Sequence, residues 1–347
     1  MHDGTRIAIL AHEKFPDRAK TAVGLLRYGD HEVVAVLDRE IAESDPDARV
    51  TDYVSDVQDA PIVGRTADAP EFDVLVIGIA PIGGGFDRSW RPDVETALES
   101  GADVWSGLHY FLADDEEFAV LAGEHDAEIW DVRRPPSDLT VAEGTAGDVD
   151  ATVVLTIGSD CSTGKMTTTM ELLEGARARG WDAGFVPTGQ TGAMIAGGGI
   201  AIDRVVSDFT AGATERMVLD AADESDYVFV EGQGSIVHPA YSTVTCGILH
   251  GAMPDAMVLT HEAGREVVHG FESFPLPDPG RLVTLYEDLA GAVHPSTVVG
   301  GALNTRGLDA AAASDAVIEY ADAIDAPAVD PVRGDVDALL DAIEGSG

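Results

Sequence analysis

The stretch Gly158-Ser-Asp-Cys-Ser-Thr-Gly164-Lys165-Met166-Thr167 decides the fold of the chain around it. It directly follows the apolar, strand-like segment Thr152–Ile157, and a helical pattern begins near Met166. A strand, a glycine-containing loop and a helix in this order predict a P-loop, in which backbone N–H groups, the helix N-terminus and a lysine bind phosphate oxygens. Lys165 strengthens this prediction, because the only other lysines precede residue 21. The expected phosphate-binding residues are Gly158, Ser159, Asp160, Cys161, Ser162, Thr163, Gly164, Lys165, Met166 and Thr167.

The loop departs from the common G-x-x-x-x-G-K-[ST] pattern at two positions. Ser159 stands where that pattern has glycine, and Met166 stands where it has the hydroxyl that normally binds Mg²⁺. The earlier glycine, with Asp160 inside the loop, resembles the G-T-D-x-x-x-G-K loop of dethiobiotin synthetase and its relatives. Thr167 could replace the missing hydroxyl only if the helix start shifts by one residue. The sequence therefore supports phosphate binding more firmly than Mg²⁺ binding, which it leaves open.

Strand and helix signals alternate on both sides of the loop, which is typical of parallel α/β folds. The polar stretch 134–150, with two prolines and two glycines, is typical of a linker. We therefore expect a Rossmann-like α/β domain over residues 1–145 and a P-loop NTPase-like domain with a doubly wound parallel sheet over residues 146–347. The expected strands are 6–10, 32–37, 72–80, 102–106, 152–157, 182–186, 227–230, 256–259 and 297–303.

The composition is strongly acidic. The 347 residues include 62 Asp and Glu against 21 Lys and Arg, which gives a formal net charge of −41. The carboxylates interleave with apolar strands along the whole chain, so we place them on folded surfaces. Nucleic acid and anionic membranes are poor partners for such a surface. An Asp- and Glu-rich, Lys-poor balance is typical of proteins from salt-in halophiles, in which molar salt screens the self-repulsion.

Targeting signals and metal-binding spacings are not evident. No apolar run reaches the ~18 residues of a membrane span, and Met1–Leu10 has neither a basic region nor a long apolar one. Cys161 and Cys246 form neither a disulfide framework nor a CxxC pair, which fits a reducing compartment. We expect a cytoplasmic homo-oligomer that acts on a small molecule and has no nucleic-acid or membrane partner.

Two segments downstream of the loop carry further candidates. The strand Tyr227–Val230 ends in Glu231 and a glycine-rich turn, which resembles the V-E-G-x-G segment of the dethiobiotin synthetase group. Such a carboxylate can hold a metal or take a proton, or it is simply a solvated strand cap. Asn304 follows the strand 297–303, where an amide could read adenine or favour a turn. In the first half, Gly83-Gly84-Gly85 after a strand either lets backbone approach a ligand or forms a flexible connection.

Together, these motifs resemble a two-domain P-loop family long catalogued as of unknown function, some members of which have been described as D-glutamate N-acetyltransferases. The resemblance rests on Gly158–Thr168, the segments Glu231–Tyr241 and His261–Arg265, and Gly301–Thr305. It extends into the first half through Pro81–Gly85, Ser106–His109 and Asp131–Pro136, so it covers nearly the whole chain.

The resemblance implies acetyl transfer from acetyl-CoA to the amine of an acidic amino acid, with the P-loop holding the phosphates of coenzyme A. Under this hypothesis Glu231, His238, His261 and Glu262 are the candidate catalytic residues, since the reaction needs a base. Arg265 and Arg306 are candidates for binding the substrate carboxylates. Asn304 joins the P-loop residues as a candidate cofactor contact.

Two other functions remain open at this point. One is an ATP- and Mg²⁺-dependent ligase or kinase related to dethiobiotin synthetase, against which Met166 counts. The other is a non-catalytic nucleotide-binding protein. The metal content, beyond a Mg²⁺ ion that would accompany ATP, is unknown from the sequence.

Overall fold

The structure is a computed structural model that describes residues 4–81 and 83–346. These residues form two compact units. One unit comprises the chain up to Pro135 together with Gln190–Arg204, and the other comprises Pro136–Gly189 and the chain from Val205 onward. The first unit therefore contains a short segment that lies far downstream in the sequence. The predicted boundary after residue 145 lies ten residues beyond the point where the two units part.

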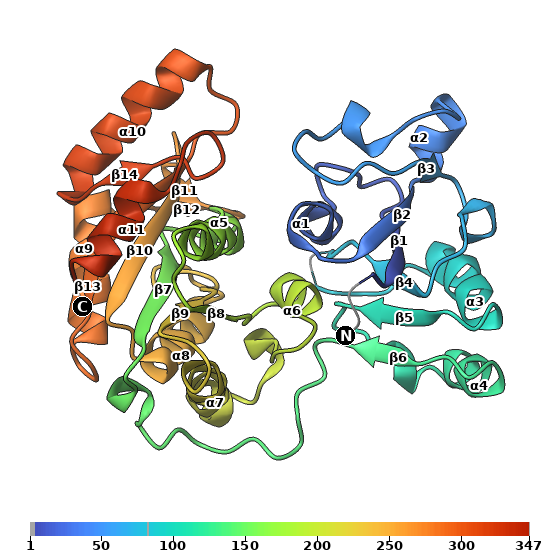
Figure 1. Cartoon of the computed structure of the whole chain (residues 1–347), viewed down its shortest axis with the longest axis horizontal. Helices are drawn as coiled ribbons and strands as arrows, with labels where there is room; N and C mark the ends of the chain where they lie inside the picture. Colours follow the sequence, from blue (N-terminus) through green and yellow to red (C-terminus); the bar gives the residue numbers. More distant parts are fainter. Residues whose placement is uncertain (1–3, 82, 347) are drawn as a thin grey trace. The chain divides into compact units, whose positions relative to one another are not determined.

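The first unit is built on a six-stranded sheet in the order β3-β2-β1-β4-β5-β6, and every strand pair in it is parallel (Figure 1). The central strands are almost wholly apolar and buried on both faces, as strands of a parallel sheet must be. The strands are β1 Arg6–Leu10, β2 Glu32–Leu37, β3 Ile62–Val63, β4 Val74–Ile77, β5 Asp103–Ser106 and β6 Ile129–Asp131.

In the sheet of the first unit, β2 and β3 lie on one side of β1, and β4, β5 and β6 lie on the other. The helices connect the strands within these two runs. Because crossovers between parallel strands are right-handed, the helices of these two runs cover opposite faces of the sheet. The α-helices are α1 Lys20–Tyr28, α2 Arg39–Ser44, α3 Arg91–Glu99, α4 Glu116–Glu124 and α6 Gln190–Ala196. The 3-10 turns are η1 Val50–Asp52, η2 Thr66–Asp68, η3 Arg88–Trp90, η4 Leu112–Asp114 and η6 Ile202–Arg204.

Helix α6 joins the first unit by packing against α1. The hydroxyls of Thr21 and Thr191 are hydrogen-bonded at 2.8 Å, and His31 Nε2 lies 3.3 Å from the carbonyl oxygen of Met194. Ala193 and Met194 are fully buried in the same apolar cluster as Leu25. The segment 190–204 thus completes the core of the first unit, although the chain on both sides of it belongs to the second.

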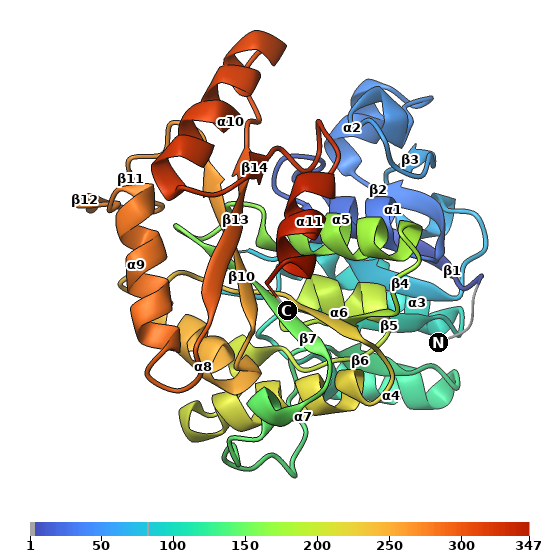
Figure 2. The same ribbon diagram turned by 60° about the vertical axis from the view of Figure 1, so that its left-hand side comes forward.

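The second unit holds another six-stranded parallel sheet, in the order β14-β13-β10-β7-β9-β8 (Figure 1). Figure 2 shows its strands β14, β13, β10 and β7 from another side. Strand β7 is central, with β9 and β8 on one side and β10, β13 and β14 on the other. The direction in which successive strands are added to the sheet therefore reverses at β7. Ligands bind at such a reversal, outside the carboxyl ends of the strands. The strands are β7 Thr152–Gly158, β8 Ala183–Val186, β9 Tyr227–Val230, β10 Ala256–Glu262, β13 Thr297–Asn304 and β14 Ala328–Val329.

Helices and one small hairpin complete the second unit. The antiparallel hairpin of β11 Val267–Val268 and β12 Phe271–Pro275 follows β10. The helices are α5 Lys165–Ala178, α7 Thr210–Ala222, α8 Ser242–Ala252, α9 Pro279–Ala290, α10 Ala310–Ile324 and α11 Asp337–Glu344, with 3-10 turns η5 Ala146–Asp148 and η7 Ser207–Phe209. The two parallel sheets confirm the predicted fold class. No helix in residues 4–81 and 83–346 is long and apolar enough to cross a membrane.

Candidate functional site

The predicted site residues of the second unit follow adjacent strands of its sheet. Glu231 follows β9, Gly158 ends β7, His261 and Glu262 end β10, and Asn304 ends β13. The register aligns Gly158 with Thr260 and Glu262 with Asn304. Because all these strands are parallel, the five positions lie along one edge of the sheet.

The loop between β7 and α5 has the backbone of an anion site. Gly164 takes a positive φ of 109° just before α5 begins at Lys165, and Ser162 also has a positive φ of 57°. Among the described residues, the N–H groups of Ser162, Thr163 and Gly164 have no acceptor, and the first turn of a helix has no internal one. Thr163 Oγ1 anchors the loop to Thr260 Oγ1 at 2.6 Å. The loop therefore offers consecutive N–H donors to a bound anion.

Lys165 lies against this loop and is 7% exposed. Its Nζ donates to the carbonyl oxygen of Asp160 at 2.7 Å. Two glycines make room for its side chain. A Cβ on Gly158 would meet Nζ at 2.7 Å, and one on Gly232 would lie 3.3 Å from Lys165 Cδ and 1.7 Å from the carbonyl oxygen of Thr156.

Asp160 is a fully buried carboxylate that ties the loop to the chain after β10. Its Oδ2 accepts from Arg265 Nη1 at 3.2 Å and from the backbone N–H of His269 at 2.7 Å. Its Oδ1 accepts from the N–H of Cys161 at 2.7 Å. A buried charge needs such partners, so Asp160 fixes the loop's shape and does not present a free carboxylate.

Arg265 is held on the same side of the loop. It donates to the carbonyl oxygen of Cys161 at 2.6 Å and forms an ion pair with Glu262, in addition to its contact with Asp160. The guanidinium therefore binds three protein groups: the carboxylates of Asp160 and Glu262 and the carbonyl oxygen of Cys161. These contacts make Arg265 a structural clamp of the loop, and they leave little of it for a substrate carboxylate.

His261 and Ser159 form a second polar pair under the loop. Ser159 Oγ lies 2.7 Å from His261 Nδ1, and the imidazole stacks on Tyr320 with the ring centres 5.6 Å apart. Burial, followed by the nearby charge of Arg265, lowers the pKa of His261 to about 4. The ring is therefore neutral at physiological pH. Ser159 is fully buried, so its hydroxyl orients the histidine and is not an accessible nucleophile.

His238 has backbone partners around its ring. Its Nδ1 accepts from the N–H of Ala240 at 3.1 Å, and the ring also hydrogen-bonds the backbone of His269. Burial lowers the pKa of this imidazole, while Asp160, whose Oδ1 is 4.0 Å from Nε2, opposes that shift. The predicted base role for His238 would require breaking one of these hydrogen bonds.

Asp160, Cys161 and His238 bring one potential metal-ligand atom each within 4.8 Å of one another. The hydrogen bonds count against a metal here. Since His238 Nδ1 accepts a hydrogen bond, the neutral ring carries its proton on Nε2, which then cannot coordinate. Both oxygens of Asp160 already accept N–H donors, and Arg265 balances its charge.

Glu231 is 6% exposed and lies across the sheet edge from the loop. Its Oε2 accepts from the N–H groups of Thr188 at 3.3 Å and Gly189 at 3.1 Å. Gly189 allows this approach, because a Cβ there would lie 3.1 Å from Oε1. Glu231 is therefore not the solvated strand cap that the sequence left open as an alternative.

The remaining candidates differ in their surroundings. Met166 and Thr167 are half-buried in the first turn of α5, and Met166 places a thioether where other P-loops have a hydroxyl. Asn304 Oδ1 accepts from the N–H of Arg306 at 3.0 Å, which is the turn interaction that asparagine favours. Arg306 itself is exposed in that turn.

Several residues that support the loop were missed by the sequence analysis. Tyr286, from α9, is fully buried and donates to the carbonyl oxygen of Gly158 at 2.7 Å, and Ser235 Oγ donates to that of Ser159 at 3.0 Å. Burial raises the pKa of Tyr286 to about 12, so it remains a donor. Thr188 and Gly189 follow β8, and their position after a predicted strand was the one available signal. No sequence pattern marked Tyr286.

Comparisons with known proteins extend over both halves of the chain. Residues 140–340 match the family described as domain of unknown function (DUF1611_C) P-loop domain, and residues 43–135 match domain of unknown function (DUF1611_N) Rossmann-like domain. The crystal structure of a DUF1611 family protein from Anabaena variabilis superimposes with a TM-score of 0.92 at 39% identity. The match covers 99% of this chain and 100% of that one.

Two curated relatives carry a functional name. A protein from Pseudoalteromonas sp, named D-glutamate N-acetyltransferase, is 34% identical over 77% of this chain and 80% of its own length. A protein of the same name from Tritonibacter scottomollicae is 36% identical over 80% of this chain and 83% of its own length.

Proposed function

The chain belongs to the two-domain DUF1611 family, and from this premise we propose that it is an N-acetyltransferase. It transfers the acetyl group of acetyl-CoA to the amine of an acidic amino acid, with D-glutamate as the first substrate to test. The single observation that carries the proposal is the anion-site geometry of the loop Gly158–Thr167, in a chain whose curated relatives are named D-glutamate N-acetyltransferase.

The loop suits the phosphates of coenzyme A. Consecutive N–H donors of Ser162–Gly164, the N-terminus of α5 and the Lys165 ammonium all face anionic oxygens in sites of this kind. Lys165 Nζ already donates to the Asp160 carbonyl within the loop, and a phosphate oxygen would replace that acceptor. In this proposal the loop supplies affinity and orientation for the acetyl donor.

A magnesium nucleotide fits the same loop less well. Mg²⁺ takes hard oxygen ligands, and Met166 offers a thioether in place of the usual hydroxyl. Asp160 is neutralised by Arg265, and Glu231 Oε2 already accepts two backbone N–H groups. The donor set around the loop therefore favours a phosphate ligand that needs no metal.

The reaction requires a base, because the substrate ammonium must lose a proton before its nitrogen attacks the thioester carbonyl. Of the four predicted candidates, three are less suited to accept a proton. His238 has its ring bonded to backbone, and Glu262 is paired with Arg265. His261 is bonded to Ser159, and its pKa is lowered to about 4. Glu231 is a buried carboxylate beside the loop, and we assign the base role to it. This assignment requires the acetyl group to lie next to the P-loop, so the pantetheine arm would fold back toward its own phosphates.

An acetylation assay tests the proposal. The protein at molar KCl would be incubated with acetyl-CoA and D-glutamate, L-glutamate or D-aspartate, with thiol release and the mass of the product as readouts. We expect thiol release that depends on an acidic amino acid and a product heavier by one acetyl group. Failure with all three acceptors, together with acceptor-dependent ADP formation from ATP and Mg²⁺, would replace the proposal with the ligase or kinase alternative.

A further inference from the structure

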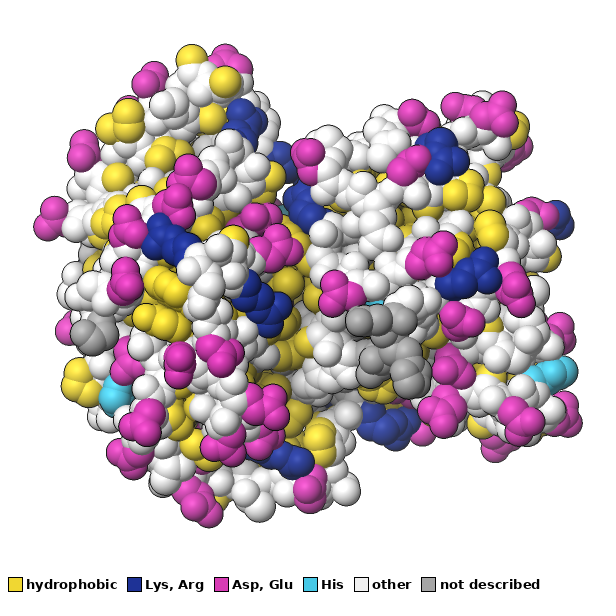
Figure 3. Space-filling view, in the orientation of Figure 1, with side chains coloured by type: hydrophobic (Ala, Val, Ile, Leu, Met, Phe, Trp, Pro, Cys, Tyr) yellow, Lys and Arg dark blue, Asp and Glu magenta, His cyan; other side chains and the backbone are white. Residues whose placement is uncertain are grey.

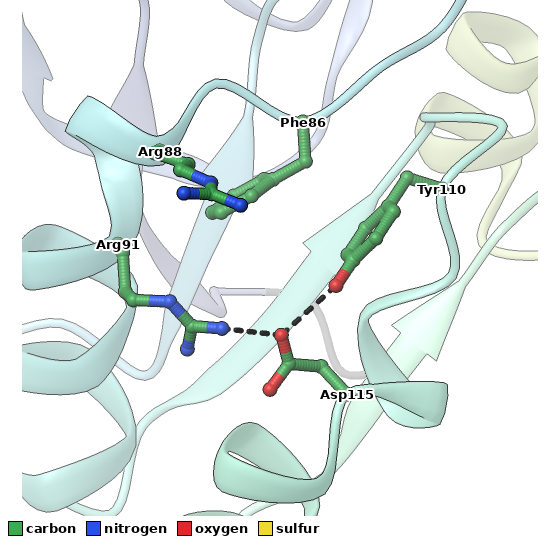
Figure 4. Close-up of a pocket in the computed structure, with 5 residues that line it drawn as sticks. All are labelled: Phe86, Arg88, Arg91, Tyr110 and Asp115. Atoms are coloured by element: carbon green, nitrogen blue, oxygen red, sulfur yellow. Dashed lines mark hydrogen bonds and ion pairs between the residues drawn. The ribbon is translucent and has the colours of Figure 1, made fainter.

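The first unit has a polar cavity of about 520 Å³ at the carboxyl edge of its sheet (Figure 4). Its lining comes from the loops after β4 and β5 and from the starts of α3 and α4. The lining residues are Phe86, Arg88, Arg91, Tyr110 and Asp115. Two arginines in one cavity stand out in a chain with a net charge of −41, in which carboxylates outnumber basic side chains almost three to one.

The two arginines differ in how their charge is balanced. Arg91 forms ion pairs with Asp115, with Glu117 at 3.1 Å and with Glu95 at 3.6 Å. Arg88 is exposed, and among the described residues no carboxylate lies within ion-pair distance of its guanidinium. An unbalanced guanidinium over a cavity is a bidentate donor for a carboxylate or phosphate.

Asp115 holds the opposite wall of the cavity in place. It caps α4 through the N–H groups of Glu117 and Phe118, and it accepts from Tyr110 OH at 2.9 Å (Figure 4). Its carboxylate is therefore occupied by Arg91, Tyr110 and the helix. It positions these groups and adds no free negative charge toward a ligand.

An aromatic wall closes the cavity on another side. The ring of Phe86 stacks on Tyr110 with centres 5.6 Å apart and an interplanar angle of 19°. Phe86 also contacts Trp90 and Phe118 edge to face. This packing fixes the wall, and its apolar surface suits the methylene chain of a small dicarboxylate.

A second, neighbouring cavity of about 300 Å³ shares Tyr110 with the first. It is lined also by His109, Phe111, Asp114 and Arg204. Arg204 lies over the Phe111 ring at 5.2 Å and, within the described residues, has no carboxylate at ion-pair distance. The two cavities share Tyr110, and each exposes one arginine that has no ion pair among the described residues, while Asp114 in the second cavity is paired with Arg134.

We propose that these cavities bind the acidic amino acid, with the Arg88 guanidinium on one of its carboxylates, the Phe86–Tyr110 wall along its methylene chain and Arg204 toward its second carboxylate. The proposal rests on the proposed function, since the acidic amino acid is the acceptor named there. It also explains why Arg265, which is held by the P-loop, is not needed for that role.

Calorimetric titration with D-glutamate, glutarate and L-alanine tests this proposal, because it needs no acetyl transfer. Wild type, Arg88→Gln and Arg88→Lys would be compared at the same molar KCl, with and without CoA. Arg65→Gln is the matched control, since Arg65 is an exposed arginine of the same unit that is paired with Asp68. We expect Arg88→Gln to weaken D-glutamate binding about tenfold or more, Arg88→Lys to weaken it less, and Arg65→Gln to leave it unchanged.

The outcomes separate this proposal from the enzymatic one. Equal D-glutamate affinity in wild type and Arg88→Gln, or no binding of D-glutamate and glutarate to wild type in either condition, overturns the assignment of the cavities. L-alanine binding as tight as D-glutamate binding also overturns it, because the site would then not read the second carboxylate. Loss of D-glutamate binding in Arg88→Gln with no acetylation by wild type would support the cavity and reject the transferase.

Discussion

At the scale of single residues, the contacts of each candidate side chain decide its role more sharply than its spacing in the sequence. Asp160 and Arg265 were predicted as cofactor and substrate contacts, and they bind each other. That pairing joins residues 105 positions apart, and no local pattern could show it. Lys165, Gly158 and Gly164 form the loop that their spacing predicted, because a P-loop is defined by adjacent residues.

Glu231→Gln tests the base assignment. The amide keeps the shape of the side chain and can still accept from Thr188 and Gly189, but it cannot take a proton. We expect kcat to fall about 100-fold or more with little change in the KM for acetyl-CoA. Steady-state kinetics at molar salt provide the readout. A raised KM with kcat preserved would instead assign Glu231 to the phosphate site.

His261→Gln tests whether the half-buried imidazole is neutral. The folded-state pKa of His261, about 4, lies below the value of about 6.5 in an unfolded chain. Between these values the unfolded state binds more protons, so the stability present above pH 6.5 is lost as the pH falls toward 4. We expect wild type to lose up to about 2 kcal/mol more than His261→Gln between pH 7 and 5, measured by chemical denaturation. Parallel losses in both proteins would show that His261 keeps its ordinary pKa when folded.

At the scale of elements, each predicted strand overlaps an observed one, but the predicted 72–80 shortens to β4 Val74–Ile77 and the predicted 256–259 lengthens to β10 Ala256–Glu262. Apolar runs such as Thr152–Ile157 and Tyr227–Val230 are buried on both faces after their first residue, so composition alone marks them. The short edge strands β3, β6 and β14 have two or three residues each and carry too little pattern to predict. The packing of α6 on α1 was also beyond prediction, because it joins residues 170 positions apart.

Gly232→Ala tests why a glycine follows the acidic residue at the end of β9. An added Cβ would lie 1.7 Å from the Thr156 carbonyl oxygen of β7, so the two strand ends would have to separate. We expect a loss of about 3 kcal/mol or more of folding free energy, together with weaker acetyl-CoA binding. Gly198→Ala is the control, since a Cβ there has nothing within 4 Å and the variant should stay within about 0.5 kcal/mol of wild type. Equal stability of both variants would show that β9 can shift at no cost.

At the scale of the whole molecule, the acidic surface is the dominant feature. Asp and Glu side chains are spread over the visible face in Figure 3, with few basic side chains among them. Some arginines form ion pairs with more than one carboxylate, as Arg179 does with Asp337 and Asp341. Because 62 carboxylates face only 21 basic side chains, most carboxylates of the described residues have no basic side chain to pair with, and they repel one another in dilute buffer.

Salt removal tests this property directly. The Debye length grows from ~3 Å at 1 M to ~30 Å at 0.01 M, so each carboxylate then interacts with many more neighbours. We expect the circular dichroism signal to be lost below a few tenths molar KCl and to return when salt is restored. A protein that is equally stable at 0.01 M and 2 M KCl would contradict the salt-dependent account of its composition.

Titration of wild type and Lys165→Ala with acetyl-CoA, and separately with ATP and Mg²⁺, at the same molar salt tests the central claim most directly. That claim is that the Gly158–Thr167 loop holds the phosphates of the acetyl donor. Lys165 bonds the loop and not the apolar core, so the variant should fold. The account predicts acetyl-CoA binding that is tighter than ATP binding in wild type and weaker by about tenfold to 150-fold in the variant, which corresponds to the loss of one charge-assisted contact of about 1.5 to 3 kcal/mol. Equal acetyl-CoA affinity in the two proteins would contradict it, because the loop would then not be the phosphate site.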